Sequence, residues 1–330
     1  MTDDATLGEE FRDDGRGAKT LPPSLIKALS RQDDRKAWLS VLSLLAVLAA
    51  CIGAAVVWWT PWGILPAIFI IASRQQACFV LAHDAAHYRL FKSRRLNDFV
   101  GRALATPVGI SMRTYRVVHR LHHNHLYGAQ DPDIPLHGGY PRGRRYLIRK
   151  LLGDLTGRTA PKTFAYFLGA PAINDEAPGS NRPLHDTTPA LRRAARQDRL
   201  FVVGFHLGAP LLALATGHFL TYLILWILPL CTVLQALLRF RAICEHGAVK
   251  DQQSPLLAAR TNLGPAWLLW YLFPYKVNYH IEHHLYPAIP HYNLPACHRE
   301  LQLRGLLDGA EVRHIFFTTE LVSADPVPAI

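Results

Sequence analysis

Long apolar runs with few or no charges constrain the fold of this chain more than any other feature. Residues 38–60 contain no charged side chain, and a helix of about 20 apolar residues crosses the hydrocarbon core of a bilayer. Beyond Pro61, residues 62–82 form a second apolar run, and residues 200–217 and 219–238 form two more. The short connection within each pair predicts two transmembrane hairpins. We therefore expect an all-α integral membrane protein with four spanning helices.

Basic residues flank these runs. The chain has 36 Lys and Arg against 25 Asp and Glu, a formal net charge of +11. Lys and Arg concentrate on the cytoplasmic side of membrane proteins, and both returning runs are followed by basic clusters, at residues 89–95 and at Arg239 and Arg241. We therefore expect a multi-pass protein with both termini in the cytoplasm. No nucleic-acid recognition module accompanies the charge, so we expect contact with membrane lipids and no nucleic acid.

Three clusters of histidines lie close to the apolar runs. The first has histidines four residues apart, and the second and third each have them at positions i, i+3 and i+4. On a helix such residues project from one face. The eight histidines are His83, His87, His119, His122, His123, His280, His283 and His284. His246, which follows the fourth run, is a ninth candidate ligand because the topology places it on the same side of the membrane.

The number of histidines indicates the kind of metal site. Imidazole nitrogens suit Fe, Zn, Cu and Ni, and eight of them exceed the four ligands of a tetrahedral zinc site. They suit two metals with four or five nitrogens each. The zinc-hydrolase pattern H-E-x-x-H is absent, and none of the five cysteines forms a C-x-x-C pair. A redox metal beside apolar spans indicates oxygen chemistry on a lipid-like substrate.

Carboxylates are interleaved with the histidines, and we expect them to accept the second ring N–H of ligating imidazoles. They are Asp84, Asp131, Asp133, Glu245 and Glu282. Histidines without cluster spacing stay outside the expected ligand set. They are His125, His137, His291 and His298. His206, inside a span, is expected to be a satisfied core residue, and His218 falls on the opposite side of the membrane.

Two further apolar stretches, residues 99–112 and 263–275, are too short to span and are expected at the membrane interface. Arg74, inside the second run, is expected to face the protein interior because a charge in lipid is costly. The sequence divides into a flexible cytoplasmic tail at 1–36, a membrane domain at 37–300 and a cytoplasmic tail at 301–330.

The three clusters resemble the histidine boxes of the membrane fatty-acid desaturase family. The first cluster looks like its H-x-x-x-H box and the others look like its two H-x-x-H-H boxes, and the resemblance covers about residues 70–300. We expect interfacial helices and a cytoplasmic helical cap around the histidines, and the family implies that these hold two iron ions, with O2 as co-substrate. His246 matches by position the extra histidine that the family places ahead of the third box. Some members have an asparagine four residues before that histidine, as a water-mediated ligand, where this chain has Ala242.

The resemblance favours desaturation of a fatty-acyl or lipid chain. The boxes do not separate this activity from hydroxylation of a lipid or hydrocarbon chain. A non-catalytic membrane metal-binding or transport protein is a further alternative, which the scarcity of polar residues within the spans disfavours. No H-P-G-G haem motif of a fused cytochrome b5 domain is present, so a separate ferredoxin or cytochrome donor is expected. A basic stretch can steer an acidic donor or contact lipid head groups: Arg142, Arg144, Arg145, Arg149 and Lys150.

Overall fold

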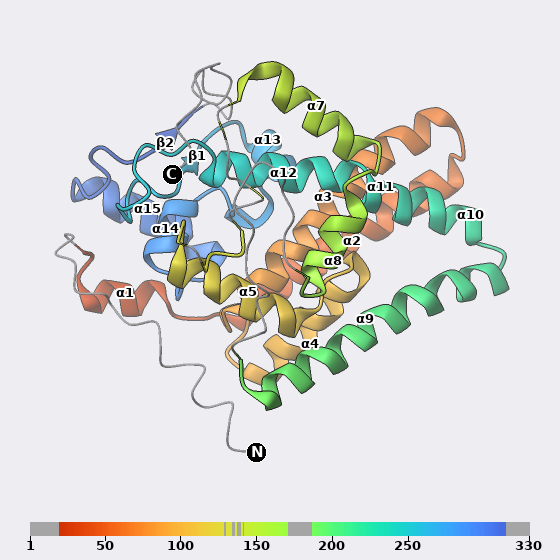
Figure 1. Ribbon diagram of the computed structural model, residues 1–330, viewed down its shortest axis with the longest axis horizontal. Coiled ribbons are helices and arrows are strands. Elements are labelled where there is room, and N and C mark those ends of the chain that lie inside the picture. The colour runs from red at the N-terminus through yellow and green to blue at the C-terminus, as the bar shows by residue number, and fades with distance from the viewer. Residues whose placement is uncertain are drawn as a thin grey trace.

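The computed structural model describes residues 20–128, 130–133, 136, 140, 142–170 and 187–314 (Figure 1). The described chain is helical apart from its loops and one pair of two-residue strands. His137 and the first nineteen residues lie outside the described residues. The all-α architecture expected from the apolar runs is confirmed.

Four helical segments are long and apolar enough to cross a membrane, as predicted. They are α2 (Asp34–Val57), α3 (Pro61–Ala86), α9 (Pro189–Ala215) and a composite fourth span, residues 219–246. The side chain of Asp33 accepts hydrogen bonds from the first backbone N–H groups of α2, and that of Thr60 does the same for α3. The first N–H groups of a helix have no acceptor within the helix itself. These caps supply one, and they therefore fix where the two helices of the first hairpin begin.

The fourth span is broken into pieces. It consists of α10 (Phe219–Tyr222), a π-helical stretch η3 (Leu223–Ile227), α11 (Leu228–Cys231) and α12 (Val233–His246). Pro229 has no N–H to donate to the preceding turn, and Thr232 leaves helical geometry at φ −122° and ψ −86°. The break redirects α12, which ends at His246.

The α3 helix is the central span. Of its most apolar stretch 72% is buried, against 11% for α9, so α9 is left to face lipid while α3 packs inside the protein. The α2, α4 (Arg94–Ala105) and α12 helices all pack against α3. Figure 1 shows the two hairpin turns at one end of the molecule and α14, α15 and the strands at the other. The last turn of α3 contacts this second region through Asp84, which binds His291.

Arg74 faces the interior of the protein, as predicted. Its guanidinium donates a 2.5 Å hydrogen bond to the carbonyl of Trp270 and stacks 3.7 Å from the centre of the Trp270 ring. It therefore fastens α13 (Ala266–Leu272) to the middle of α3. Trp267 on α13 is 71% exposed, which fits the interfacial position expected for this stretch.

The remaining elements form a helical cap at the end of α3. The helices that carry the second and third histidine clusters are α5 (Met112–His125) and α14 (His280–Leu285). The other elements are η2 (Thr106–Val108), α7 (Gly143–Leu155), α8 (Ala160–Phe167), η4 (Pro274–Lys276), η5 (His291–Asn293) and α15 (Leu294–Leu303). The strands β1 (Thr261–Asn262) and β2 (Val312–Arg313) pair in parallel.

The two segments expected as tails contain packed structure where they are described. Leu21 is 1% exposed, and α1 (Pro23–Leu29) packs with Leu21 against Ile281 of α14. Leu301 and Leu307 join the same apolar cluster. The expected flexible tail therefore does not extend over residues 20–36. The apolar residues of this segment pack against the cap, but the charged residues around them make this pattern hard to recognise in the sequence.

Candidate metal centre

Four helices bring the histidine clusters together. His83 lies in the last turn of α3 and His87 caps that helix. The α5 helix begins at the cap residue Ser111 and carries the second cluster in its final turns, while the six-residue α14 carries the third. His246 is the last residue of α12. The later turns of α3, α5 and α12, together with the short α14, therefore bring the three clusters and His246 into the same region of the cap.

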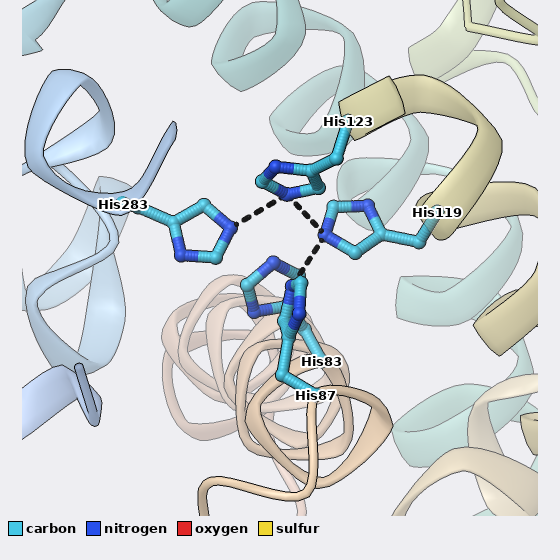
Figure 2. Close-up of side chains that lie close together, drawn as sticks. All are labelled: His83, His87, His119, His123 and His283. Carbon is cyan, nitrogen blue, oxygen red and sulfur yellow. Dashed lines mark hydrogen bonds between the residues drawn. The ribbon is translucent and has the colours of Figure 1, made fainter. Parts of the chain in front are cut away.

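The first group of nitrogens draws on three helices (Figure 2). One ring nitrogen from each of its five histidines lies within 4.8 Å of all the others. Nε2 of His119 lies 2.9 Å from Nε2 of His87 and 3.0 Å from Nε2 of His123, which in turn lies 3.0 Å from Nε2 of His283. The five are His83, His87, His119, His123 and His283.

A second group lies next to the first. Nitrogens of His122, His246 and His284 lie within 4.8 Å of one another. Nε2 of His280 lies 2.8 Å from Nε2 of His246 and 3.2 Å from Nε2 of His284, so it belongs to the same group. The ring centres of His123 and His284 are 4.4 Å apart, which joins the two groups. All nine candidate ligands thus fall into adjacent sets of five and four.

Helix geometry explains why each H-x-x-H-H cluster divides between the groups. Four residues advance a helix by about 40° beyond a full turn, whereas three fall about 60° short of one. His119 and His123 therefore face the first group together and His122 turns to the second. In α14 the i, i+4 pair His280 and His284 joins the second group, and His283 joins the first.

The nitrogens fit metal ions. Donors bound to one metal at right angles with bonds of about 2.1 Å lie about 3 Å apart, which matches the shortest separations within both groups. Burial and the neighbouring imidazoles lower the pKa values of His87, His119 and His123 well below the usual range. The same two causes lower those of His283 and His284. These rings are therefore neutral at pH 7, the form that binds metal.

His122 differs from the other cluster histidines. Burial by itself lowers its pKa, but Asp131 and Asp133 outweigh burial and raise it to about 9. Nδ1 of His122 lies 3.0 Å from Oδ1 of the buried Asp131, whose oxygens also accept the backbone N–H groups of Tyr127 and Asp133. Asp131 thus fixes the ring so that Nε2 faces the second group, as expected for a carboxylate beside a ligating histidine.

Two carboxylates within the clusters bind histidines outside them. Asp84 Oδ2 lies 2.7 Å from Nδ1 of His291 and accepts the backbone N–H of that residue. Glu282 Oε1 lies 2.5 Å from Nδ1 of His298, and its Oε2 accepts from the hydroxyl of Thr261. Asp84 Oδ1 also lies 3.4 Å from Nδ1 of His83, so Asp84 borders a candidate ligand ring as expected. The sequence did not lead us to foresee His291 and His298 as partners of these two carboxylates.

The described histidines that were left outside the ligand set lie outside both nitrogen groups. Among the described residues, neither nitrogen group includes His125, and His206 is satisfied by a 2.9 Å contact with the carbonyl of Thr106. His218 is exposed at the turn between α9 and α10. Glu245 Oε2 lies 3.7 Å from Nε2 of His280, so this carboxylate borders the second group.

A helical protein whose membrane-length spans converge on two adjacent groups of imidazoles defines a class of membrane protein with a candidate metal centre. Comparison with known proteins identifies this class. The family model described as fatty acid desaturase matches residues 57–316. The chain belongs to the fatty acid desaturase family and is an oxidoreductase.

Relatives with assigned names are also desaturases. The chain is 27% identical to the dihydrorhizobitoxine desaturase of Bradyrhizobium elkanii over 260 residues, which cover 74% of this chain and 69% of that protein. It is 26% identical to the sn-1 oleoyl-lipid 12-desaturase of Synechocystis sp. over 305 residues, 86% of this chain and 80% of that protein. A chloroplastic omega-3 fatty acid desaturase of Glycine max is 26% identical over 270 residues, 76% of this chain and 55% of that protein.

Proposed function

We propose that this protein is an O2-dependent di-iron desaturase that introduces a double bond into the acyl chain of a lipid or fatty acid. The observation that carries the proposal is the division of nine buried or half-buried imidazoles into adjacent groups of five and four. Two metals with nitrogen ligands suit the two groups. The family and the named relatives support desaturation as the reaction.

The residues of the chain have distinct tasks in this proposal. The first group holds one iron and the second group the other, with nine ligands in all: His83, His87, His119, His122, His123, His246, His280, His283 and His284. When bound, the irons supply the O2 chemistry that removes two hydrogens from adjacent carbons. Asp131 fixes the tautomer of His122, while Asp84 and Glu282 hold α3 and α14 against the segment that carries His291 and His298.

The proposal includes an orientation in the membrane and a source of electrons. We place both termini and the metal centre on the cytoplasmic side, because basic residues gather at that end of the spans. Two electrons per turnover come from a separate ferredoxin or cytochrome. The exposed α7 residues Arg142, Arg144, Arg145 and Arg149 offer a surface for an acidic donor. Residues 37–300 are proposed as the catalytic membrane domain.

Expression in a host with a simple lipid profile, followed by mass spectrometry of total lipids, tests the reaction. Desaturation gives a product about two mass units lighter than its precursor, whereas hydroxylation gives one about sixteen heavier. His283→Ala should abolish the product, and His125→Ala, which removes a histidine outside both groups, should retain it. Full product formation by His283→Ala would overturn the proposal.

A further inference from the structure

A cavity of about 200 Å³ lies beside the first histidine group. His87 and His119 form part of its wall. The rest of the wall is strongly basic, and in the described part of the chain no Asp or Glu lines it. The cationic side chains are Arg89, Lys92, Arg94, Arg113, Arg116 and Arg120. A concave site where polar groups of one charge converge is a typical ligand site.

Some of these cations already have partners. Arg116 donates to Asp98 at 2.7 Å and to the carbonyls of Ala85 and Ala86 at the end of α3. Arg94 lies 5.3 Å from the centre of the Tyr88 ring. These two arginines therefore build the wall of the cavity.

The remaining arginines are available to a ligand. Within the described residues, the guanidinium groups of Arg89, Arg113 and Arg120 make no hydrogen bond or ion pair, although all three are half-buried. A nearby carboxylate, Asp198, is engaged by Arg102 at 2.6 Å. Like charges that converge in a half-buried cavity repel one another, and an anion relieves that repulsion. The planar guanidinium matches carboxylate and phosphate groups with two hydrogen bonds.

The cavity lies at the level where two spans end and beside the charged first turns of α9, which precede the apolar run at residues 200–217. Gln32 in its wall comes two residues before α2, Ala86 is the last residue of α3, and Leu191 is in the first turn of α9. The ends of spanning helices lie at the depth of lipid head groups in a bilayer. A ligand at this position is therefore the charged end of a molecule whose apolar part lies in the membrane.

We propose that this arginine cavity binds the anionic head group, a carboxylate or a phosphate, of the acyl substrate. The proposal rests on the desaturase function, since it assigns the substrate's charged end to the side of the metal centre formed by His87 and His119. An acidic electron donor is the less fitting occupant, because the unpaired guanidiniums line a hollow of small-molecule size. The exposed face of α7 offers such a protein a broader basic surface.

Binding of chain-matched probes to the purified, iron-loaded full-length protein in non-ionic detergent tests the proposal. The probes are oleate, oleyl phosphate and oleyl alcohol, which share a chain and differ in head group, with inorganic phosphate alone as a fourth. The test variant is Arg89→Gln combined with Arg120→Gln. The control is Arg158→Gln, which removes one exposed charge outside the cavity. The iron content of each protein shows whether the metal centre is intact.

The wild-type protein and Arg158→Gln should bind at least one of the anionic probes on the order of tenfold more tightly than oleyl alcohol. The double variant should lose that preference while it keeps its iron and its affinity for oleyl alcohol. Whichever of oleate and oleyl phosphate binds more tightly then identifies the head group as carboxylate or phosphate.

Two results would overturn the proposal. The first is an unchanged preference for anionic probes in the double variant. The second is binding of inorganic phosphate with no discrimination among the chain-bearing probes, which would assign the cavity to free anion. If the variant keeps the preference but no longer accepts electrons from an acidic ferredoxin, the cavity belongs to the electron donor instead. Because the binding assay needs no turnover, loss of the desaturase function itself would appear separately, as absence of product from every protein.

Discussion

Replacement of Glu282 by glutamine is expected to weaken metal binding without altering any ligand. Glu282 is 0% exposed and lies between His280 and His283 on the short α14 helix. Its two oxygens engage the hydroxyl of Thr261 at 2.6 Å and Nδ1 of His298 at 2.5 Å. Glutamine keeps the shape of the side chain but presents one oxygen and one NH2 group. One of the two partners therefore loses its acceptor.

The structure sets the size of the effect. A hydrogen bond to a charged group contributes about 1.5–3 kcal/mol, and the variant loses about one such bond. His298 cannot adapt cheaply by moving its proton, because Nε2 of this ring is buried without a partner among the described residues. Substitution of a group that orients ligands reduces metal affinity about 10–100-fold. We expect both a lower free energy of unfolding and a lower iron affinity, since α14 carries ligands of both nitrogen groups.

Iron retention against a chelator and denaturant unfolding in micelles measure these two quantities. The matched control is Glu300→Gln on α15, where the carboxylate is partly exposed and its oxygen lies 3.4 Å from Arg304. Such a surface pair contributes about 0–1 kcal/mol. If Glu282→Gln held iron as tightly as Glu300→Gln and unfolded within about 0.5 kcal/mol of it, the orienting role of Glu282 would be refuted.

Three further outcomes are expected. His246→Ala should lose one of two irons while His125→Ala keeps both, as metal analysis of the two proteins will show, because only His246 lies in a nitrogen group. Asp84→Asn should lower the free energy of unfolding by about 1–3 kcal/mol, since it replaces the charged carboxylate that accepts twice from His291 with a neutral amide that has one acceptor oxygen. An unchanged unfolding midpoint would contradict this. In the metal-free protein, neighbouring carboxylates outweigh burial and hold the pKa of His122 at about 9, so this ring keeps its proton at pH 7. Metal must displace that proton, so iron affinity titrated against pH should rise by up to about tenfold per unit towards pH 9 and then level off, and a flat profile would contradict the assignment.

The spans and the clusters were predictable because each depends on local regularity. A charge-free run of bilayer length admits few structures other than a helix. The i, i+3, i+4 spacing likewise places histidines on one side of a helix wherever that helix packs. His246 was found because the topology of the fourth span brought it to the side of the other clusters. The expected inward position of Arg74 followed from the cost of a charge in lipid.

The connections between distant segments were not predictable. His291 and His298 meet Asp84 and Glu282 only because η5 and α15 fold back across the ends of α3 and α14. No periodic pattern in the sequence predicts that these segments fold back. The packing of α1 under α14 was missed for a related reason, since a seven-residue helix among charges has no recognisable pattern. The arginine cavity likewise joins residues from four separate stretches.

The metal content of the purified protein tests the central claim most directly. The two adjacent nitrogen groups predict two irons per chain, with negligible zinc, and one iron in His246→Ala. One tightly bound zinc per chain and no iron would contradict the di-iron assignment, and with it the O2-dependent desaturation that we derive from these histidines.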